Sequence, residues 1–244
     1  SIERKLRELV ETGRLAELDE LEREIRPELV GLGRLVGLGP QRMVALGQAL
    51  GISTAAEFRA AADAGRLREA PGIGPSTEAK IRAALAEPHP APRHGLLLNR
   101  AWELAGGIAS ALGGDVAGDP RRFCDASERL AVVVSSPDVD AVRERFRSLP
   151  EIVALVDEST GVTVDGVPVE LVVAPPERFG TALVRATGSD AFVASLGELP
   201  VAATEEEVFR ALGRAYVPPE LREEPFDGAP PALVEQRAIR GDLH

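Results

Sequence analysis

Two short glycine-containing segments carry the clearest chemistry in this sequence of 244 residues. Residues 36–42 read Val-Gly-Leu-Gly-Pro-Gln-Arg and lead into a predicted helix at 43–50, and residues 71–77 read Pro-Gly-Ile-Gly-Pro-Ser-Thr and lead into another at 78–85. The glycines allow a positive φ and a close approach of another molecule to the backbone. The N–H groups that open the following helix suit a phosphate oxygen.

This Gly-apolar-Gly pattern is typical of a helix-hairpin-helix, which holds a nucleic-acid backbone without reading bases. One copy could be an ordinary turn between packed helices, but here two copies lie 35 residues apart, and both have proline after the second glycine. We therefore expect binding to double-stranded or gapped DNA. The residues expected to contact it are Gly37, Leu38, Gly39, Gln41 and Arg42 in the first hairpin, and Gly72, Ile73, Gly74, Ser76 and Thr77 in the second.

The formal net charge of −11 argues against a phosphate-containing partner for the chain as a whole. Between Arg34 and Arg93, however, eight cations face five anions, a net of +3, which leaves −14 for the remainder. Any phosphate contact should therefore lie in this segment. Because hairpins bind mainly through backbone amides and one or two cations, an acidic chain can still use them.

The elements that must position these hairpins are helices, since apolar residues recur at helical spacing up to residue 88. Three prolines within residues 87–95 indicate a linker. The pattern then changes to α+β, with Trp102 expected at a core position and Cys124 expected to act as a small apolar residue. The predicted elements are helices at 97–112, 138–149 and 205–212, the last capped by Thr204 and Glu207; strands at 129–135 and 152–156; and a hairpin at 161–173 turning at Asp165-Gly166.

Composition excludes several classes of protein. No apolar run approaches the roughly 20 residues of a membrane-spanning helix, so we expect no membrane partner. A single cysteine cannot form an internal disulfide. We therefore expect a reducing, cytoplasmic location.

Several motifs resemble those of DNA polymerase family X, the relatives of DNA polymerase beta. Residues 118–122 resemble its Gly-Ser-x-Arg-Arg, residues 187–190 its Thr-Gly-Ser-Asp turn, and residues 169–173 the strand with its third carboxylate. Residues 1–13 resemble the last helix of its lyase domain, residues 218–223 the bacterial branch, and residues 239–244 the start of a phosphoesterase (PHP) domain.

The resemblance implies a multidomain chain, with an all-α helix-hairpin-helix region before an α+β nucleotidyltransferase-like palm and a small α/β thumb. It also implies a fragment of a longer protein, cut at both ends. The expected parts are a lyase-domain remnant at 1–25, a DNA-binding fingers domain at 26–88, a linker at 89–95, the palm at 96–175, the thumb at 176–232 and an approach to a PHP domain at 233–244.

The expected metal site departs from the family pattern. Family polymerases hold two Mg²⁺ ions with an Asp-x-Asp pair and a third carboxylate. Here those positions are Arg129, Ala131 and Glu170. Divalent cations of this kind need several oxygen ligands, so we expect no metal, no cofactor and no catalysis. Asp125 and Glu128 are nearby carboxylates that could substitute, although solvated loop charges fit them better.

The nucleotide pocket expected from the resemblance keeps some of the family's residues and lacks others. Its remnant comprises Gly118, Arg121, Arg122, Thr187, Gly188, Ser189 and Asp190. Asp119 replaces a serine that would donate to phosphate, and Val193 and Gly197 replace polar contacts of the family. The two arginines could equally form a surface ion pair.

Three functions remain open from the sequence. The first is a DNA-binding, catalytically inactive polymerase X core, a pseudoenzyme acting in DNA repair. The second is an active gap-filling polymerase with a rearranged metal site. The third is a protein-interaction scaffold for a PHP nuclease.

Overall fold

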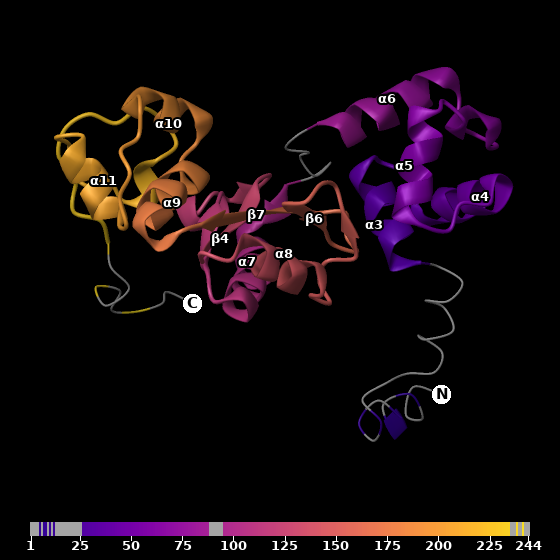
Figure 1. The fold of residues 1–244 in the computed structure, drawn as a ribbon, viewed down its shortest axis with the longest axis horizontal. Helices are drawn as coiled ribbons and strands as arrows, with labels where there is room; N and C mark the ends of the chain where they lie inside the picture. The colour runs from indigo at the N-terminus through magenta and orange to yellow at the C-terminus, as the bar shows by residue number, and fades with distance from the viewer. Residues whose placement is uncertain are drawn as a thin grey trace.

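The computed structural model describes residues 26–87 and 95–234, together with a few isolated residues nearer the ends. We name three parts: the helical module (26–87), the sheet unit (95–174) and the C-terminal unit (175–234). Figure 1 shows them side by side in chain order. The predicted lyase remnant (1–25), linker (89–95) and PHP approach (233–244) lie almost wholly outside the described residues.

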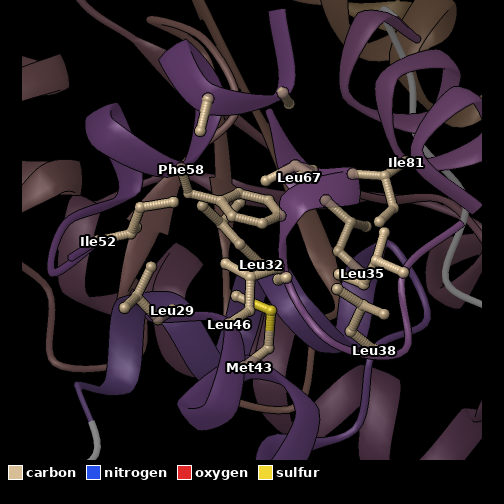
Figure 2. Packing of buried hydrophobic residues seen from close by; sticks show 14 of the residues in the cluster. Leu29, Leu32, Leu35, Leu38, Met43, Leu46, Ile52, Phe58, Leu67 and Ile81 are labelled. Atoms are coloured by element: carbon tan, nitrogen blue, oxygen red, sulfur yellow. The ribbon is translucent and has the colours of Figure 1, made fainter. Parts of the chain in front are cut away.

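The helical module packs its helices around one apolar core. Phe58, Leu32 and Leu46 lie at its centre with almost no exposed surface (Figure 2). The two helices predicted after the hairpins begin three residues earlier than expected, at a proline, because the fixed φ of proline suits the first helical position. The helices are α3 (Pro27–Leu35), α4 (Pro40–Leu50), α5 (Ala55–Asp63), the 3₁₀ turn η1 (Leu67–Glu69) and α6 (Pro75–Ala86).

The helical module contacts the sheet unit directly. Arg34 donates to Asp165 Oδ1 at 2.7 Å and to the Val164 carbonyl at 2.9 Å. Arg59 donates to the Leu155 carbonyl at 2.6 Å. Val162 of the sheet also belongs to the apolar cluster of the helical module. Apolar packing and polar bonds therefore both join the two parts.

The sheet unit contains a mixed five-stranded sheet with the order β2-β4-β7-β6-β5, in which only β4 and β7 are parallel. Neighbouring residues of a strand face opposite sides, so Val132 packs with α7 and α8 whereas Val133 packs with α9. The elements are β1 (Leu96–Leu97), α7 (Leu98–Leu112), β2 (Asp115–Gly118), the 3₁₀ turn η2 (Pro120–Arg122), β3 (Ala126–Ser127), β4 (Leu130–Ser135), α8 (Val139–Arg147), β5 (Ala154–Leu155), β6 (Thr160–Val162) and β7 (Pro168–Ala174). A separate two-stranded sheet pairs β1 with β3.

Most elements predicted for this unit are present, with shorter strands. The predicted hairpin is confirmed, since β6 pairs with β7 and Gly166 turns the chain at φ 76°. The strand expected at 152–156 shortens to two residues. Trp102 is 43% exposed, so the prediction of a core position for it was wrong. It lies on the solvent side of α7, whereas Ala101 and Ala105 face the core.

The C-terminal unit is helical, and the expectation of an α/β thumb was wrong for its fold class. No strand occurs in described residues 176–234. The irregular backbone at 202–203 gives its carbonyls to N–H groups in the first turn of α9, at Gly180 and Thr181, instead of to another strand. The capping box of Thr204 and Glu207 is confirmed. The elements are η3 (Pro176–Arg178), α9 (Phe179–Thr187), α10 (Asp190–Leu196), α11 (Glu205–Ala211) and η4 (Pro219–Leu221). Across the described ranges, no helix combines the length and apolarity needed to cross a membrane.

Candidate nucleic-acid interface and nucleotide pocket

The two hairpins have the same backbone geometry. Gly37 and Gly72 have φ values of 83° and 80°, in the left-handed region that favours glycine. Leu38 and Ile73, between the glycines, are buried in the helical core. Each second glycine is then the N-cap of the following helix. The turn therefore requires the first glycine, and the core requires the apolar residue.

The second glycine of each hairpin is not required by the fold. Gly39 and Gly74 have negative φ values of −69° and −91°, which any residue can adopt. A Cβ placed on either would meet no atom within 4 Å. An N-cap also favours Ser, Thr, Asp or Asn, whose side chains bond to the helix. A bare backbone at these two exposed positions thus suits the approach of a molecule from outside.

Two cations near the hairpins have no opposite charge beside them. Arg42 and Lys80 are exposed and form no ion pair with any described residue. Gln41 and Ser76 are also exposed, whereas Thr77 is half-buried. The other cations of the described module are largely committed: Arg34, Arg66, Arg68 and Arg82 form ion pairs and Arg59 bonds to a carbonyl.

The first hairpin borders a cleft of about 560 Å³ between the helical module and the sheet unit. Gly37, Leu38 and Gly39 line one side, and the β6–β7 turn lines the other. Arg100 of α7 also lines this cleft. A strand held by the first hairpin would therefore lie against the N-terminal end of α7.

The structure brings Arg129, Ala131 and Glu170 together on one side of the sheet. Ala131 and Glu170 are direct partners on the parallel strands β4 and β7. Arg129, two residues before Ala131, donates from Nε and Nη2 to Glu170 Oε2 at 3.3 and 3.2 Å. The guanidinium therefore neutralises the carboxylate. Asp125 and Glu128, the other carboxylates considered, have exposed side chains.

Asp119 lies in a small anion-binding nest made by the chain itself. Its Oδ2 accepts from the backbone N–H of Glu128 at 2.6 Å and of Arg129 at 2.7 Å. Its Oδ1 accepts from Arg122 Nη2. Two amides and a guanidinium converge here as they would on a phosphate oxygen, and the Asp119 carboxylate takes that place.

Comparisons with known proteins bear on the two hairpins and on the rest of the chain. Residues 32–87, which include both hairpins, match the family described as a SAM-like helix-hairpin-helix tandem. Over 277 aligned positions, 98% of this chain is 25% identical to "DNA polymerase/3'-5' exonuclease PolX" of Bacillus subtilis (strain 168). The chain is therefore similar to this PolX protein over nearly its whole length. It spans about half the length of that relative, 48% of it.

The two arginines matched to the nucleotide pocket both bond to protein groups. Arg122 is buried and donates to Asp119, to Glu223 Oε1 at 2.7 Å and to the Thr187 carbonyl at 2.6 Å. Arg121 donates to both carboxylate oxygens of Glu205 at 2.8 Å and to Thr187 Oγ1 at 2.8 Å. Both arginines form ion pairs: Arg122 is buried, whereas Arg121 is 20% exposed and Glu223, the partner of Arg122, is 49% exposed.

Glu205 joins two arginines in a buried triad. Besides Arg121 it accepts from Arg222 Nη1 at 2.6 Å, and the side chain of Arg222 has no exposed surface. Burial raises the pKa of Glu205, but the hydrogen bonds and charges of Arg121 and Arg222 outweigh burial and hold its pKa below the ordinary value of 4.5. Arg222 also lies over the Phe209 and Tyr216 rings. The triad fastens the C-terminal unit to the sheet unit.

The turn matched to Thr-Gly-Ser-Asp lies beside these arginines. Thr187 is buried, and Gly188 is packed so closely that a Cβ would lie 2.8 Å from the Phe192 ring. Ser189 Oγ accepts from the Phe192 N–H and donates to the Glu223 carbonyl. Asp190 is exposed. The structure thus brings Gly118, Arg121, Arg122, Thr187, Gly188 and Ser189 to one place, where Glu223 bonds to both Arg122 and Ser189.

Sequence reasoning missed Glu205, Arg222 and Glu223 at this site. One signal was available for Glu205, because it falls at helical spacing with Val208, Phe209 and Leu212 and so shares their buried face. Nothing in the sequence pairs Arg222 with it. Cys124, expected to act as a small apolar residue, donates its thiol to Glu223 Oε1 at 2.6 Å. Burial and that bond raise the pKa of Cys124 to about 11.

Proposed function

We propose that this protein binds double-stranded or gapped DNA through its two hairpins. The observation that carries the proposal is the pair Gly39 and Gly74, where the fold would accept a side chain and the sequence leaves the backbone bare. Arg42 and Lys80, which form no ion pair within the described part of the chain, supply charge for phosphates. The tandem match over residues 32–87 supports the same function.

We further propose that the sheet unit is a polymerase-like palm and the C-terminal unit a thumb, and that together they do not catalyse nucleotidyl transfer. Divalent cations need several oxygen ligands. The position offers a guanidinium, a methyl group and one carboxylate that is already paired with Arg129. Within the described ranges, no three or more His, Cys, Asp or Glu side chains are grouped to hold a metal ion. These residues do not fit a Mg²⁺ pair.

The phosphate-binding side of the pocket supports the same conclusion. The nest that would receive an anion holds the Asp119 carboxylate, which would repel phosphate. Both Nη atoms of Arg121, and Nε and Nη1 of Arg122, donate to protein acceptors. A nucleoside triphosphate would have to compete with these acceptors for the two guanidinium groups.

DNA binding is tested by fluorescence anisotropy of labelled duplex and gapped DNA. We expect Gly39→Leu combined with Gly74→Leu to weaken binding at least tenfold, because two side chains would then separate phosphates from the backbone. Gly107→Leu is the matched control, since this helical glycine is exposed and also has open space around it. Unchanged affinity in the double variant, or no affinity in the parent, would favour the protein-interaction scaffold.

Catalysis is tested by primer extension on gapped DNA with Mg²⁺ or Mn²⁺. We expect no product from the wild type. Product that disappears in Glu170→Ala would overturn the proposal and establish the second candidate, an active gap-filling polymerase with a rearranged metal site.

The biological setting that we propose is DNA repair in the cytoplasm. The relative's name combines a polymerase with a 3'-5' exonuclease, and this chain spans about half of its length. We propose that the chain positions a repair intermediate for a PHP nuclease in the same protein. The longer protein should then cleave gapped DNA faster than its Gly39→Leu/Gly74→Leu form, and equal rates would argue against this role.

A further inference from the structure

Trp102 and Phe123 form a stacked aromatic pair on the surface of the sheet unit. Their ring centroids are 5.6 Å apart at an interplanar angle of 24°. Trp102 is 43% exposed and Phe123 is 54% exposed. The chain has one tryptophan, and the other six phenylalanines are buried or half-buried: Phe58, Phe146, Phe179, Phe192, Phe209 and Phe226. An outward-facing pair is therefore unusual within this molecule.

The backbone of Phe123 makes the position more unusual. Its φ of 61° is the only positive value at a described residue other than glycine. Bulky residues rarely adopt this conformation, which glycine would accept without strain. The turn is held by the Phe123 N–H bonded to the Pro120 carbonyl at 3.0 Å and the Cys124 N–H bonded to the Asp119 carbonyl at 3.2 Å. The fold thus keeps a strained, exposed ring that its core does not use.

The pair lies close to the proposed DNA path. Arg100, at the start of α7, lines the cleft of the first hairpin. Trp102 follows two residues later, about 3 Å further along the helix axis and about 200° around it, so its ring lies on another face of the same helical turn. A strand that leaves the first hairpin and crosses the first turn of α7 would reach the pair. The rings need no charge to bind a base, because every base has a flat π face.

We propose that Trp102 and Phe123 are a stacking platform for an unpaired nucleobase in the gap of a gapped DNA. This inference rests on the proposed DNA-binding function and adds a reason to prefer gapped DNA to an intact duplex. A paired base is already stacked on its neighbours, so only an unpaired one gains from the platform. Stacking of this kind is tolerant of base identity.

The single tryptophan allows a direct experiment, because intrinsic tryptophan fluorescence reports Trp102 alone. We expect gapped DNA with several unpaired thymines to quench this fluorescence and an intact duplex of matching length to leave it unchanged. Anisotropy of the same labelled DNAs measures affinity separately. Phe123→Gly and Trp102→Ala should each weaken binding of gapped DNA by about fivefold to about a hundredfold, the range for one stacked base, and leave duplex binding unchanged.

Neither substitution should disturb the fold, so a change in affinity would report the loss of the ring. Glycine at 123 accepts the positive φ, and alanine at 102 is the strongest helix former. Val201→Ala removes an apolar side chain that is 58% exposed in the C-terminal unit and should change neither affinity. Gapped DNA that binds without quenching, with the same affinity in both variants, would overturn the platform and leave the hairpin function standing. No binding of either DNA by the wild type would overturn both.

Discussion

The buried triad of Arg121, Glu205 and Arg222 allows the most direct test of how the C-terminal unit is held to the sheet unit. Glu205→Ala removes a carboxylate whose side chain is only 6% exposed. The change leaves Arg222, with no exposed surface, and Arg121, 20% exposed, without their shared counter-ion. Arg222 Nη2 already lacks a hydrogen-bond partner within the described residues. The guanidinium of Arg222 would then keep only its bond to the Val217 carbonyl and its two aromatic contacts.

The loss of stability expected for Glu205→Ala follows from the burial of these side chains. Removing one partner of a buried ion pair costs about 3–5 kcal/mol, because the remaining charge stays desolvated and unpaired. We expect about 4 kcal/mol for Glu205→Ala. For a chain of this size that corresponds to a fall in Tm of about 8–16 °C. Glu206→Ala is the control, since the adjacent carboxylate is exposed, and should cost about 0.5 kcal/mol through the helix dipole.

The pH dependence of stability gives a second test of the ion pairs of Glu205. Because the pKa of Glu205 is lowered in the folded protein, the unfolded chain takes up the proton first as the pH falls. The stability due to Glu205 is therefore present above its ordinary pKa of 4.5 and is lost as the pH falls through the lower folded value. Glu205→Gln should lack this dependence, so the gap in Tm between wild type and Glu205→Gln should narrow below pH 4.5.

Thermal unfolding followed by circular dichroism between pH 3 and pH 8 measures both effects. A loss of less than about 1 kcal/mol in the free energy of unfolding for Glu205→Ala would refute the reasoning, because removing one partner of a buried ion pair costs more than that when the pair forms. A constant gap in Tm across the acid range would refute the pKa assignment alone.

Three further predictions concern the nest, the hairpins and the thiol. Asp119→Ser should gain pyrophosphate binding that the wild type lacks, measured by calorimetry, because the amides and guanidinium of the nest lose their internal anion; no gain would show that the nest is not an anion site. Arg42→Gln and Lys80→Gln should each reduce the slope of log affinity for duplex DNA against log salt by about 0.9, whereas Arg66→Gln, whose charge is paired in the structure, should change it less. Cys124, with its pKa raised to about 11, should react with iodoacetamide at pH 8 at least about tenfold more slowly than it does in the unfolded chain, and comparable rates would contradict the raised pKa.

The sequence by itself determined the features that depend on local signals. The Gly-apolar-Gly turns, the helices after them, the hairpin at Gly166 and the capping box at Thr204 were all predictable. Each follows from residues within a few positions of one another, whose conformational preferences act regardless of the rest of the fold. The family resemblance also rests on such short motifs, and the comparison with PolX supports it.

The tertiary structure alone decided which charges meet. Arg34 pairs with Asp165 at a separation of 131 residues, and Arg121 pairs with Glu205 at a separation of 84. No periodicity encodes such a pair, because its partners come together only when packed elements bring them into contact. The same holds for the exposed face of Trp102, which depends on what α7 packs against. Local preference builds the hairpins, whereas long-range packing pairs the arginines of the expected nucleotide pocket with carboxylates far away in the sequence.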